Sequence, residues 1–424
     1  MAQLVYLCFR DNTLSEPFSN LIDMKYDHQI KVSKPSFKLP EFEKVKQLIE
    51  ICNELKRTYK KEPTGGSPQL FHLALEQLRV LNRIYENRTN WMTELLYQSG
   101  EQLYAIASKL DEIQNKLDGP VDTGDGDEEE SYLIQAGRVM HMTLNICFKD
   151  RNERVDENRK IGVFYIGTLL FKLYNRIKAY GLLNNMCKVF ESHFNEIGPY
   201  LSRINNDLIV IRFKFYMGLY YGYEKNNYAL GFKWLQETFD ICTLYESIPS
   251  TYKVRSQVLI YLIPMRILHL RHYPRLAPLR RKYPSVAKIY TMLVKSLCSG
   301  NLKLYEKFIE DNEFYLVKRN LYVTVLKMKE LVELKLVKKA WILNRGNTKV
   351  PLDMLAKAFQ ISRGTPRHVA ENIAPNHDQQ LDELECVLAT LISKNYIKGY
   401  LSHSHRVMMT SKTPFPGLAK PLER

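Results

Sequence analysis

The spacing of hydrophobic and polar positions between Leu321 and Ser411 changes along the chain, and the changes predict a small domain of three helices and a β-hairpin. A stripe of apolar residues at spacings of three and four predicts one helix of about seven turns from Leu321 to Leu343, which Gly346 ends. Pro351 suits the first position of a second, short helix, because its missing N–H would have no partner there.

A third helix is predicted from about Leu381 to Asn395, after a loop from Ser362 to Gln380. Beyond it the apolar period becomes two from Ile397 to Leu401, and VMMTS follows the polar HSHR as a second strand. Three helices and a hairpin in this order predict a winged helix over residues 321–412.

The rest of the chain has helical patterns and no strand pattern, so the predicted fold class is mainly α. Between residues 132 and 320, helices alternate with short polar breaks, which predicts an irregular α-solenoid whose helix pairs cover one another's apolar faces. The turn from Tyr223 to Cys242 is loosely like a tetratricopeptide repeat, without a strict repeat of about 34 residues. We also expect helices between Pro40 and Leu117, one of them over 91–117, and leave the structure of residues 1–40 open.

The segment Gly119–Ser131 is acidic, contains glycine and has one large apolar residue, Val121, which predicts a flexible linker or surface loop. The patterns therefore divide the chain into four parts. These are an N-terminal helical region that ends with this linker (1–131), the helical-repeat part (132–320), the winged helix (321–412) and a C-terminal tail (413–424).

Composition places the chain among folded proteins of a reducing compartment. Of its 424 residues, 45% are hydrophobic and 25% charged, which is ordinary for a folded domain. Its seven cysteines are scattered without a C-x-x-C pair, so neither a disulfide framework nor a zinc site is predicted. We find no secretory leader and no apolar run of the roughly 18 residues that a membrane span needs. We therefore expect a soluble protein of the nucleus and cytoplasm that has no membrane partner.

The positive charge of the chain is concentrated in one region. Residues 250–349 contain 21 Lys or Arg and 6 Asp or Glu, so their net charge is 21 − 6 = +15, whereas the remaining residues balance at 40 against 40. A local basic excess attracts phosphate backbones or an acidic protein, and charge alone does not distinguish them.

Two groups of basic residues are candidates for binding nucleic acid or an acidic partner. Arginine can pair with two oxygens of a phosphate or a carboxylate, which favours a binding role for an arginine-rich run. The alternatives are a solvated helix corner for the first group and ordinary solvated side chains for the second. The first group is Arg266, Arg271, Arg275, Arg280, Arg281 and Lys282, and the second, in the winged helix, is Lys335, Lys338, Lys339, Arg345, Lys349, Lys394, Lys398 and Arg406.

The third helix of the predicted winged helix opposes sequence-specific reading of DNA. A recognition helix presents its N-terminal residues to the bases after a turn of about three or four residues. Here the segment Leu381–Glu385 is acidic and the loop before it is far longer. We expect this helix to be mostly structural, with any RNA or DNA held nonspecifically by flanking cations.

No catalytic, cofactor-binding or metal-binding residue is predicted. His269 and His272 can share a helix face but have no third ligand nearby in sequence. The pair His403 and His405 fits a hairpin tip better than a metal site, because no glutamate is identifiable as its partner. The common phosphate-loop, dinucleotide, hydrolase and zinc-protease motifs do not occur. The sequence therefore predicts a protein that is not an enzyme.

A helical repeat followed by a winged helix resembles the PCI domain. The wording of four segments is similar to the family of signalosome subunit twelve, which also holds the PCI subunit of the nuclear-pore-associated transcription and mRNA export complex. The resemblance extends from about Tyr132 to Pro416, and it is closer to subunit twelve. The four segments are Cys147–Lys178, Val258–Leu270, Cys298–Tyr322 and Leu381–Pro416.

The resemblance implies a noncatalytic scaffold subunit that pairs with a second PCI-domain protein through the winged helix. It also implies a very small acidic partner shared with the proteasome lid, and a composite surface for RNA or DNA. A role in the signalosome, or in mRNA processing, splicing or export coupled to transcription elongation, would follow. The alternative is a sequence-specific DNA-binding transcription regulator, which a defined motif in a binding-site selection would favour.

Overall fold

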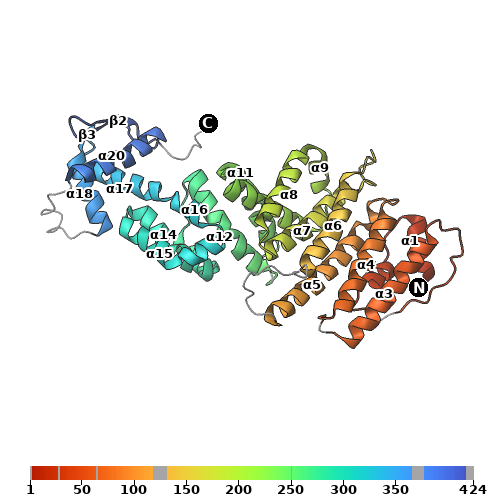
Figure 1. The fold of residues 1–424 in the computed structure, drawn as a ribbon. Helices are drawn as coiled ribbons and strands as arrows, with labels where there is room; N and C mark the ends of the chain where they lie inside the picture. The colour runs from red at the N-terminus through yellow and green to blue at the C-terminus, as the bar shows by residue number, and fades with distance from the viewer. Residues whose placement is uncertain are drawn as a thin grey trace, which may run out of the picture. The chain divides into compact units, whose positions relative to one another are not determined.

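The computed structural model describes residues 2–26, 29–63, 65–117, 131–249, 251–364 and 377–416. The described part is mainly α-helical with three short strands near the C-terminus, which confirms the predicted fold class (Figure 1). The chain divides into two compact units, an N-terminal unit of residues 1–216 and a C-terminal unit of residues 217–424. Among the described helices, none combines the length and the apolar character that a bilayer crossing demands.

The N-terminal unit is a stack of helices in which α3, α4, α5 and α6 lie side by side (Figure 1). Residues 1–40, for which the sequence predicted no structure, contain α1 and α2. The helix expected over 91–117 is present as α5, which follows the short turn η1. The elements are α1 (Ala2–Asp11), α2 (Glu16–Ile22), α3 (Phe42–Lys61), α4 (Pro68–Tyr85), η1 (Asn90–Met92), α5 (Thr93–Leu117), α6 (Tyr132–Phe148), η2 (Arg159–Ile161), α7 (Gly162–Arg176), α8 (Tyr180–Ser192), α9 (Phe194–Leu201) and α10 (Asp207–Leu219), which runs into the next unit.

Helix α7 forms the centre of this unit, because it is buried on nearly all of its faces. Its Phe164 and Phe171 belong to an aromatic cluster with Phe190 of α8 and Phe213 of α10. The ring centroids of Phe164 and Phe213 are 4.8 Å apart, and those of Phe190 and Phe213 are 5.5 Å apart. Aromatic contacts of this kind add to the stability gained from burial of the rings.

Helices α5 and α6 are joined by a side-chain cap. The Asp111 carboxylate of α5 accepts hydrogen bonds from the hydroxyl of Ser131 at 2.6 Å and from the backbone N–H groups of Tyr132 and Leu133 at 2.9 and 3.2 Å. It therefore satisfies N–H groups that have no partner within α6. The predicted acidic linker, apart from Ser131, lies outside the described residues.

The segment between α6 and α7 is held by an ion pair with little exposure to water. The Arg159 Nε donates to the carboxylate of Asp150 at 3.1 Å, and its Nη1 donates to the carbonyls of Tyr85 and Glu86 at 2.9 and 2.7 Å. Burial raises the pKa of Asp150, but hydrogen bonds from Arg159 and Asn152 outweigh it and leave the pKa below its ordinary value. Asp150 and Arg159 therefore stabilise the fold of this segment.

The C-terminal unit contains more helices and the winged helix. Helices α11 and α12 pack tightly against each other, and the strands lie beside α20 (Figure 1). Near the start of α11, Gly231 lies so close to Gly222 that a Cβ atom on it would lie 2.6 Å from the Gly222 Cα. The elements are η3 (Tyr220–Glu224), α11 (Tyr228–Leu244), α12 (Thr251–Leu270), α13 (Leu276–Lys282), α14 (Pro284–Ser299), α15 (Leu302–Lys318), α16 (Tyr322–Leu326), α17 (Lys329–Leu343), β1 (Lys349–Pro351), α18 (Leu352–Arg363), α20 (His377–Ser393), β2 (Gly399–Ser402) and β3 (Val407–Thr410).

The single helix predicted from Leu321 to Leu343 is wrong, because the chain breaks into α16 and α17 between Leu326 and Lys329. The hydroxyl of Tyr305 on α15 donates to the carbonyls of Val325 and Leu326 at 3.0 and 3.3 Å. In an unbroken helix these carbonyls would accept from N–H groups four residues later. Here the carbonyl of Val325 also accepts from the N–H of Met328 at 2.9 Å, three residues later, so a tighter turn and a hydroxyl distant in sequence together cap the end of α16.

The winged helix is present, with a strand that the pattern did not predict. Strand β1 pairs with β3 in antiparallel register, Val350 opposite Met408, and the sheet order is β1-β3-β2. Pro351 ends β1 and precedes α18, so its predicted place as the first residue of the second helix is wrong by one position. A strand of three residues is too short to show a period.

The third helix begins earlier than predicted. Helix α20 starts at His377, four residues before Leu381, and α18 continues to Arg363, so the predicted loop over 362–380 is too long. The polar segment HDQQ has no apolar residue to mark the added turn. Residues 365–376 of that loop lie outside the described part.

The winged helix packs directly on the helices that precede it. The hydroxyl of Ser362 on α18 donates to the carbonyl of Gly300 at 2.8 Å and accepts from the N–H of Leu302 at 2.9 Å. Gly300 ends α14 with a φ of +69°, and a Cβ there would lie 2.8 Å from the backbone nitrogen of Leu336 on α17. Helices α14, α15, α17 and α18 are therefore in contact through the backbone at this turn.

A carboxylate is buried where these helices meet. Only 6% of the surface of Glu333 on α17 is exposed. Burial raises the pKa of Glu333 above its ordinary value of 4.5, although the cations Lys329 and Arg363 oppose the shift. An ionised group in this position costs folding free energy.

Replacing Glu333 by Gln should raise the melting temperature at pH 7 by about 1–3 °C, because the amide removes a charge that burial penalises. The folded-state pKa is raised, so the stabilising effect of protonating Glu333 is complete below pH 4.5 and is lost as the pH rises through the raised value. The advantage of Gln should therefore shrink toward about pH 4. Thermal unfolding of both proteins across this pH range measures it, and an equal advantage at both ends would contradict the assignment.

Candidate functional site

A basic pocket of about 300 Å³ lies within the C-terminal unit. It is bordered by the end of α12 and the segment after it, by α17 of the winged helix, and by the segment that follows β3. Three of its lining side chains are cations and a fourth is a histidine, and among the described residues no carboxylate lines it. The lining residues are Leu270, Arg271, His272, Tyr273, Leu331, Leu334, Lys335, Lys338, Phe415 and Pro416.

Arg271 connects the end of α12 to the winged helix. Its backbone is left-handed, with φ +58°, and its N–H still donates to the carbonyl of Ile267 at 3.0 Å. This geometry turns the chain at the end of α12. The guanidinium donates to the hydroxyl of Tyr396 at 2.5 Å and lies 5.0 Å from the centre of the same ring. A hydrogen bond and a cation–π contact therefore hold one pair of side chains.

The opposite wall of the pocket depends on α17 and the C-terminal segment. Lys335 and Lys338 are three residues apart and therefore lie on one face of α17. The ammonium of Lys338 lies 5.7 Å from the ring centre of Phe415, and the ring of Trp341 meets Phe415 edge to face at 5.6 Å. The carbonyl of Pro414 accepts from the N–H of Lys398 at 2.7 Å, which holds this segment after β3.

The structure thus brings together three of the predicted basic residues from two distant parts of the sequence. Arg271 belongs to the arginine-rich run, whereas Lys335 and Lys338 belong to the winged helix. Tyr273, Phe415 and the apolar residues of the pocket were not predicted as site residues. Only the alternation of basic and aromatic residues in the run could have indicated Tyr273.

Arg275, Arg280, Arg281 and Lys282 of the arginine-rich run lie in or next to α13, which has no buried residue, whereas Arg266 lies on α12. Lys282 pairs with Glu246 at 3.5 Å and is partly neutralised by it. The exposed members are Arg266, Arg275, Arg280 and Arg281.

The remaining predicted cations of the winged helix do not gather in the pocket. The ammonium of Lys339 donates to the carbonyl of Ser299 at 2.6 Å. Lys394 pairs with Glu330. Arg345, Lys349 and Lys398 are exposed. Binding of a nucleic acid or an acidic partner by these five cations stays a prediction.

Arg406 lies in the turn between β2 and β3, the wing of the winged helix, and forms ion pairs with carboxylates of α20. Its Nη1 donates to Asp382 at 2.9 Å and to Glu385 at 3.2 Å, and its Nη2 is 3.6 Å from Asp378. The hydrogen bond that Arg406 donates to Asp382 is the main reason why the pKa of Arg406 is raised. The wing is therefore attached to α20 through a cation whose charge is already balanced.

The histidine pair of the wing has a glutamate beside it, so the expectation that no glutamate would be its partner is wrong. The Nδ1 of His403 is 2.8 Å from Glu385, 18 residues earlier in the chain. Oxygens of Asp382 and Glu385 and a nitrogen of His403 lie within 4.8 Å of one another, a spacing that a metal ion could bridge. The Arg406 guanidinium also contacts all three, at 3.4 Å or less. It supplies the positive charge that a metal ion would bring.

Comparison with known proteins places these features in context. The sequence profile of the PCI domain matches residues 286–412, from α14 to the residue pair after β3. The chain is similar to COP9 signalosome complex subunit 12 of Kluyveromyces lactis, with 97% identity over 424 residues that cover 100% of both chains. It is 34% identical over 387 residues to the protein of that name from Eremothecium gossypii, covering 90% of each chain. It is 31% identical over 401 residues to that of Saccharomyces cerevisiae, covering 90% of this chain and 89% of the other.

Proposed function

The chain belongs to the family of COP9 signalosome complex subunit 12, and from this premise we propose that it is a noncatalytic scaffold subunit of a multi-subunit complex. The match to the PCI domain and the near-complete coverage of its relatives support a shared architecture. In this proposal the stacked helices carry partners and the winged helix pairs with a second PCI-domain protein. The complex acts as a signalosome-type assembly, or in mRNA processing or export.

The basic pocket is the observation that carries a role in binding RNA or DNA. Arg271, Lys335 and Lys338 lie around one hollow whose described lining contains no carboxylate. Phosphate groups are attracted to such a site regardless of base sequence, and counterion release then makes binding dependent on salt. The aromatic rings of Tyr273 and Phe415 at its border can contact a base or a ribose. The proposed binding is nonspecific.

Pairing with a second PCI-domain protein is proposed at the open edge of the winged-helix sheet. Strand β2 lies at the edge of the sheet, because the strand order is β1-β3-β2. Tyr400 on β2 is 63% exposed. An edge strand presents backbone N–H and C=O groups that another chain can pair with, and an exposed aromatic side chain adds contact area.

The small acidic partner is proposed on the basic surface at α13. Arg280 and Arg281 are exposed at the C-terminal turn of a helix that buries none of its own residues. Arg266 and Arg275 add exposed positive charge before it in sequence. Carboxylates of an acidic chain can pair with several guanidinium groups at once, which supports recognition by charge and geometry together. Action in the nucleus and cytoplasm is part of the same proposal.

The alternative role as a sequence-specific DNA-binding regulator has less support. The first half of α20 carries Asp378, Asp382 and Glu385, and the cation nearest to them, Arg406, is paired with all three. Phosphates would be repelled where a recognition helix normally approaches the groove.

Changing Lys335 and Lys338 together to Glu should weaken binding of a single-stranded oligouridylate about tenfold at roughly 0.1 M salt. The slope of log affinity against log salt should also fall by about two, one for each lost phosphate contact. Fluorescence anisotropy across a salt series measures both. The matched control is Lys303→Glu with Lys307→Glu on α15, which changes net charge equally outside the pocket. Equal losses in the two double variants would mean that general charge, and not the pocket, holds RNA.

Purification of the full-length tagged protein from its native cells should recover two companions, a second PCI-domain protein and a very small acidic chain. Mass spectrometry of the copurifying proteins identifies them. Reversing Arg280, Arg281 and Lys282 to Glu should lose the small acidic chain and retain the PCI protein, because only the former depends on this charge. A protein recovered alone, as a monomer, would refute the scaffold role.

A further inference from the structure

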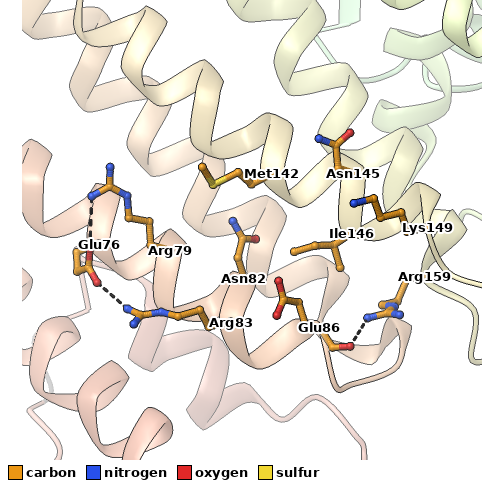
Figure 2. A pocket seen from close by; sticks show the side chains of 10 residues that line it. All are labelled: Glu76, Arg79, Asn82, Arg83, Glu86, Met142, Asn145, Ile146, Lys149 and Arg159. Carbon is orange, nitrogen blue, oxygen red and sulfur yellow. Dashed lines mark hydrogen bonds and ion pairs between the residues drawn. The ribbon is translucent and has the colours of Figure 1, made fainter.

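The N-terminal unit contains a groove of about 800 Å³ between α4 and α6. It is far in sequence from the basic pocket and from the wing. Figure 2 shows its side chains, which come from one face of each helix and from η2. On both helices they recur at spacings of three and four, as residues of a single helix face do. The lining residues are Glu76, Arg79, Asn82, Arg83, Glu86, Met142, Asn145, Ile146, Lys149 and Arg159.

The bottom of the groove is closed by a polar contact and bordered by apolar side chains. Asn82 is buried, and its side-chain oxygen accepts from the hydroxyl of Thr143 at 2.8 Å. Met142 and Ile146 lie one turn apart on α6 beside it (Figure 2). Met142 is 56% exposed, whereas Met140 of the same helix is buried. A flexible, exposed methionine in a concave site is typical of surfaces that accept an apolar side chain of a partner.

The rim of the groove carries more positive than negative charge. Four cations and two carboxylates line it, a difference of 4 − 2 = +2. Arg79 and Arg83 share one carboxylate, Glu76, at 3.6 and 2.7 Å (Figure 2). Glu76 is the one acidic partner of both guanidinium groups among the described residues, which leaves donor capacity for a second carboxylate.

The opposite rim has polar groups with open capacity. Within the described part of the chain, the side chains of Asn145 and Lys149 have no hydrogen bond or ion pair. Lys149 can therefore pair with an incoming carboxylate, and the Asn145 amide can pair with a peptide backbone. Arg159 closes this end of the groove and is already bound to Asp150 and to two carbonyls.

We propose that this groove binds a short acidic segment of a partner protein, with one apolar side chain on Met142 and Ile146. Carboxylates on either side of that anchor pair with Arg83 and Arg79 on one rim and with Lys149 on the other. The site goes beyond the proposed function, because neither the winged helix nor the basic residues of the C-terminal unit contribute to it.

A peptide fits this groove better than a free phosphate. A phosphate dianion bound by Arg79 and Arg83 would lie beside the Glu76 carboxylate and close to Glu86, and like charges repel. It would also leave the apolar surface of Met142 in water. An amphipathic peptide places single negative charges at the rims and covers that surface, so both features of the groove are matched.

The probe is a fluorescent peptide in which aspartates and glutamates surround a single phenylalanine, measured by anisotropy with the full-length protein. The Met142→Glu substitution should weaken its binding about tenfold or more, because it places a charge where the anchor sits. The matched control is Ile134→Glu, an exposed apolar residue of the same helix that does not line the groove and should leave affinity unchanged. Replacing the peptide phenylalanine by serine should weaken binding to a similar degree.

Charge reversal separates recognition from damage to the fold. Arg79→Glu with Arg83→Glu should lose the acidic peptide and gain affinity for a version with lysine in place of its acidic residues. A variant that had unfolded could not make this exchange. The proposal is overturned if the original protein does not bind the acidic peptide, or if Ile134→Glu weakens binding as much as Met142→Glu does. Competition by inorganic phosphate as effective as by unlabelled peptide would also overturn it, since the groove would then be an anion site only.

Discussion

The packing of α17 against α14 and α15 is the constraint on which the C-terminal unit depends. The hydroxyl of Tyr305 donates to the carbonyls of Val325 and Leu326 at the end of α16, where the chain turns into α17. Gly300 allows the backbone of α17 to approach the end of α14, where a side chain would collide with Leu336. The winged helix is therefore docked on the stacked helices through backbone contacts, which leave little freedom for it to shift.

This docking gives the basic residues their arrangement. The arginine-rich run and the winged helix are each positive in sequence, but only some of their cations meet. Arg271 reaches the winged helix through Tyr396, and Lys335 lies across the pocket from it. Arg406 and Lys394 are neutralised by carboxylates of the same unit. A basic stretch of sequence therefore produces a positive surface potential only where the fold places no carboxylates beside its cations.

Much of the fold could be predicted from the sequence, because long helices carry a strong period. The mainly α class and the winged helix were predicted correctly, and the resemblance to the family of subunit twelve is confirmed by identity along the whole chain. The break before Lys329 could not be predicted, since the hydroxyl that caps the end of α16 belongs to Tyr305 on another helix. Strand β1 has three residues and shows no period of its own.

The sites were harder to predict than the fold, because each depends on contacts between distant segments. The partner of His403 is Glu385, which only the closure of the wing on α20 brings near. The groove between α4 and α6 joins residues about 60 positions apart, and its residues have no motif in common. Periodicity can identify the exposed face of a helix, but it cannot say which exposed faces border the same hollow.

The winged helix and the end of α12 form one body, and a double-mutant cycle between Arg271 and Tyr396 tests their coupling most directly. The free energy of unfolding of Arg271→Gln, Tyr396→Phe and the double variant would be measured by chemical denaturation. We predict a coupling free energy of about 0.5–2 kcal/mol, because the two side chains are in contact. The control cycle pairs Arg266→Gln with Tyr396→Phe, for which we expect additive effects. A coupling free energy for Arg271 and Tyr396 as small as in this control would show that the two segments do not act as one body.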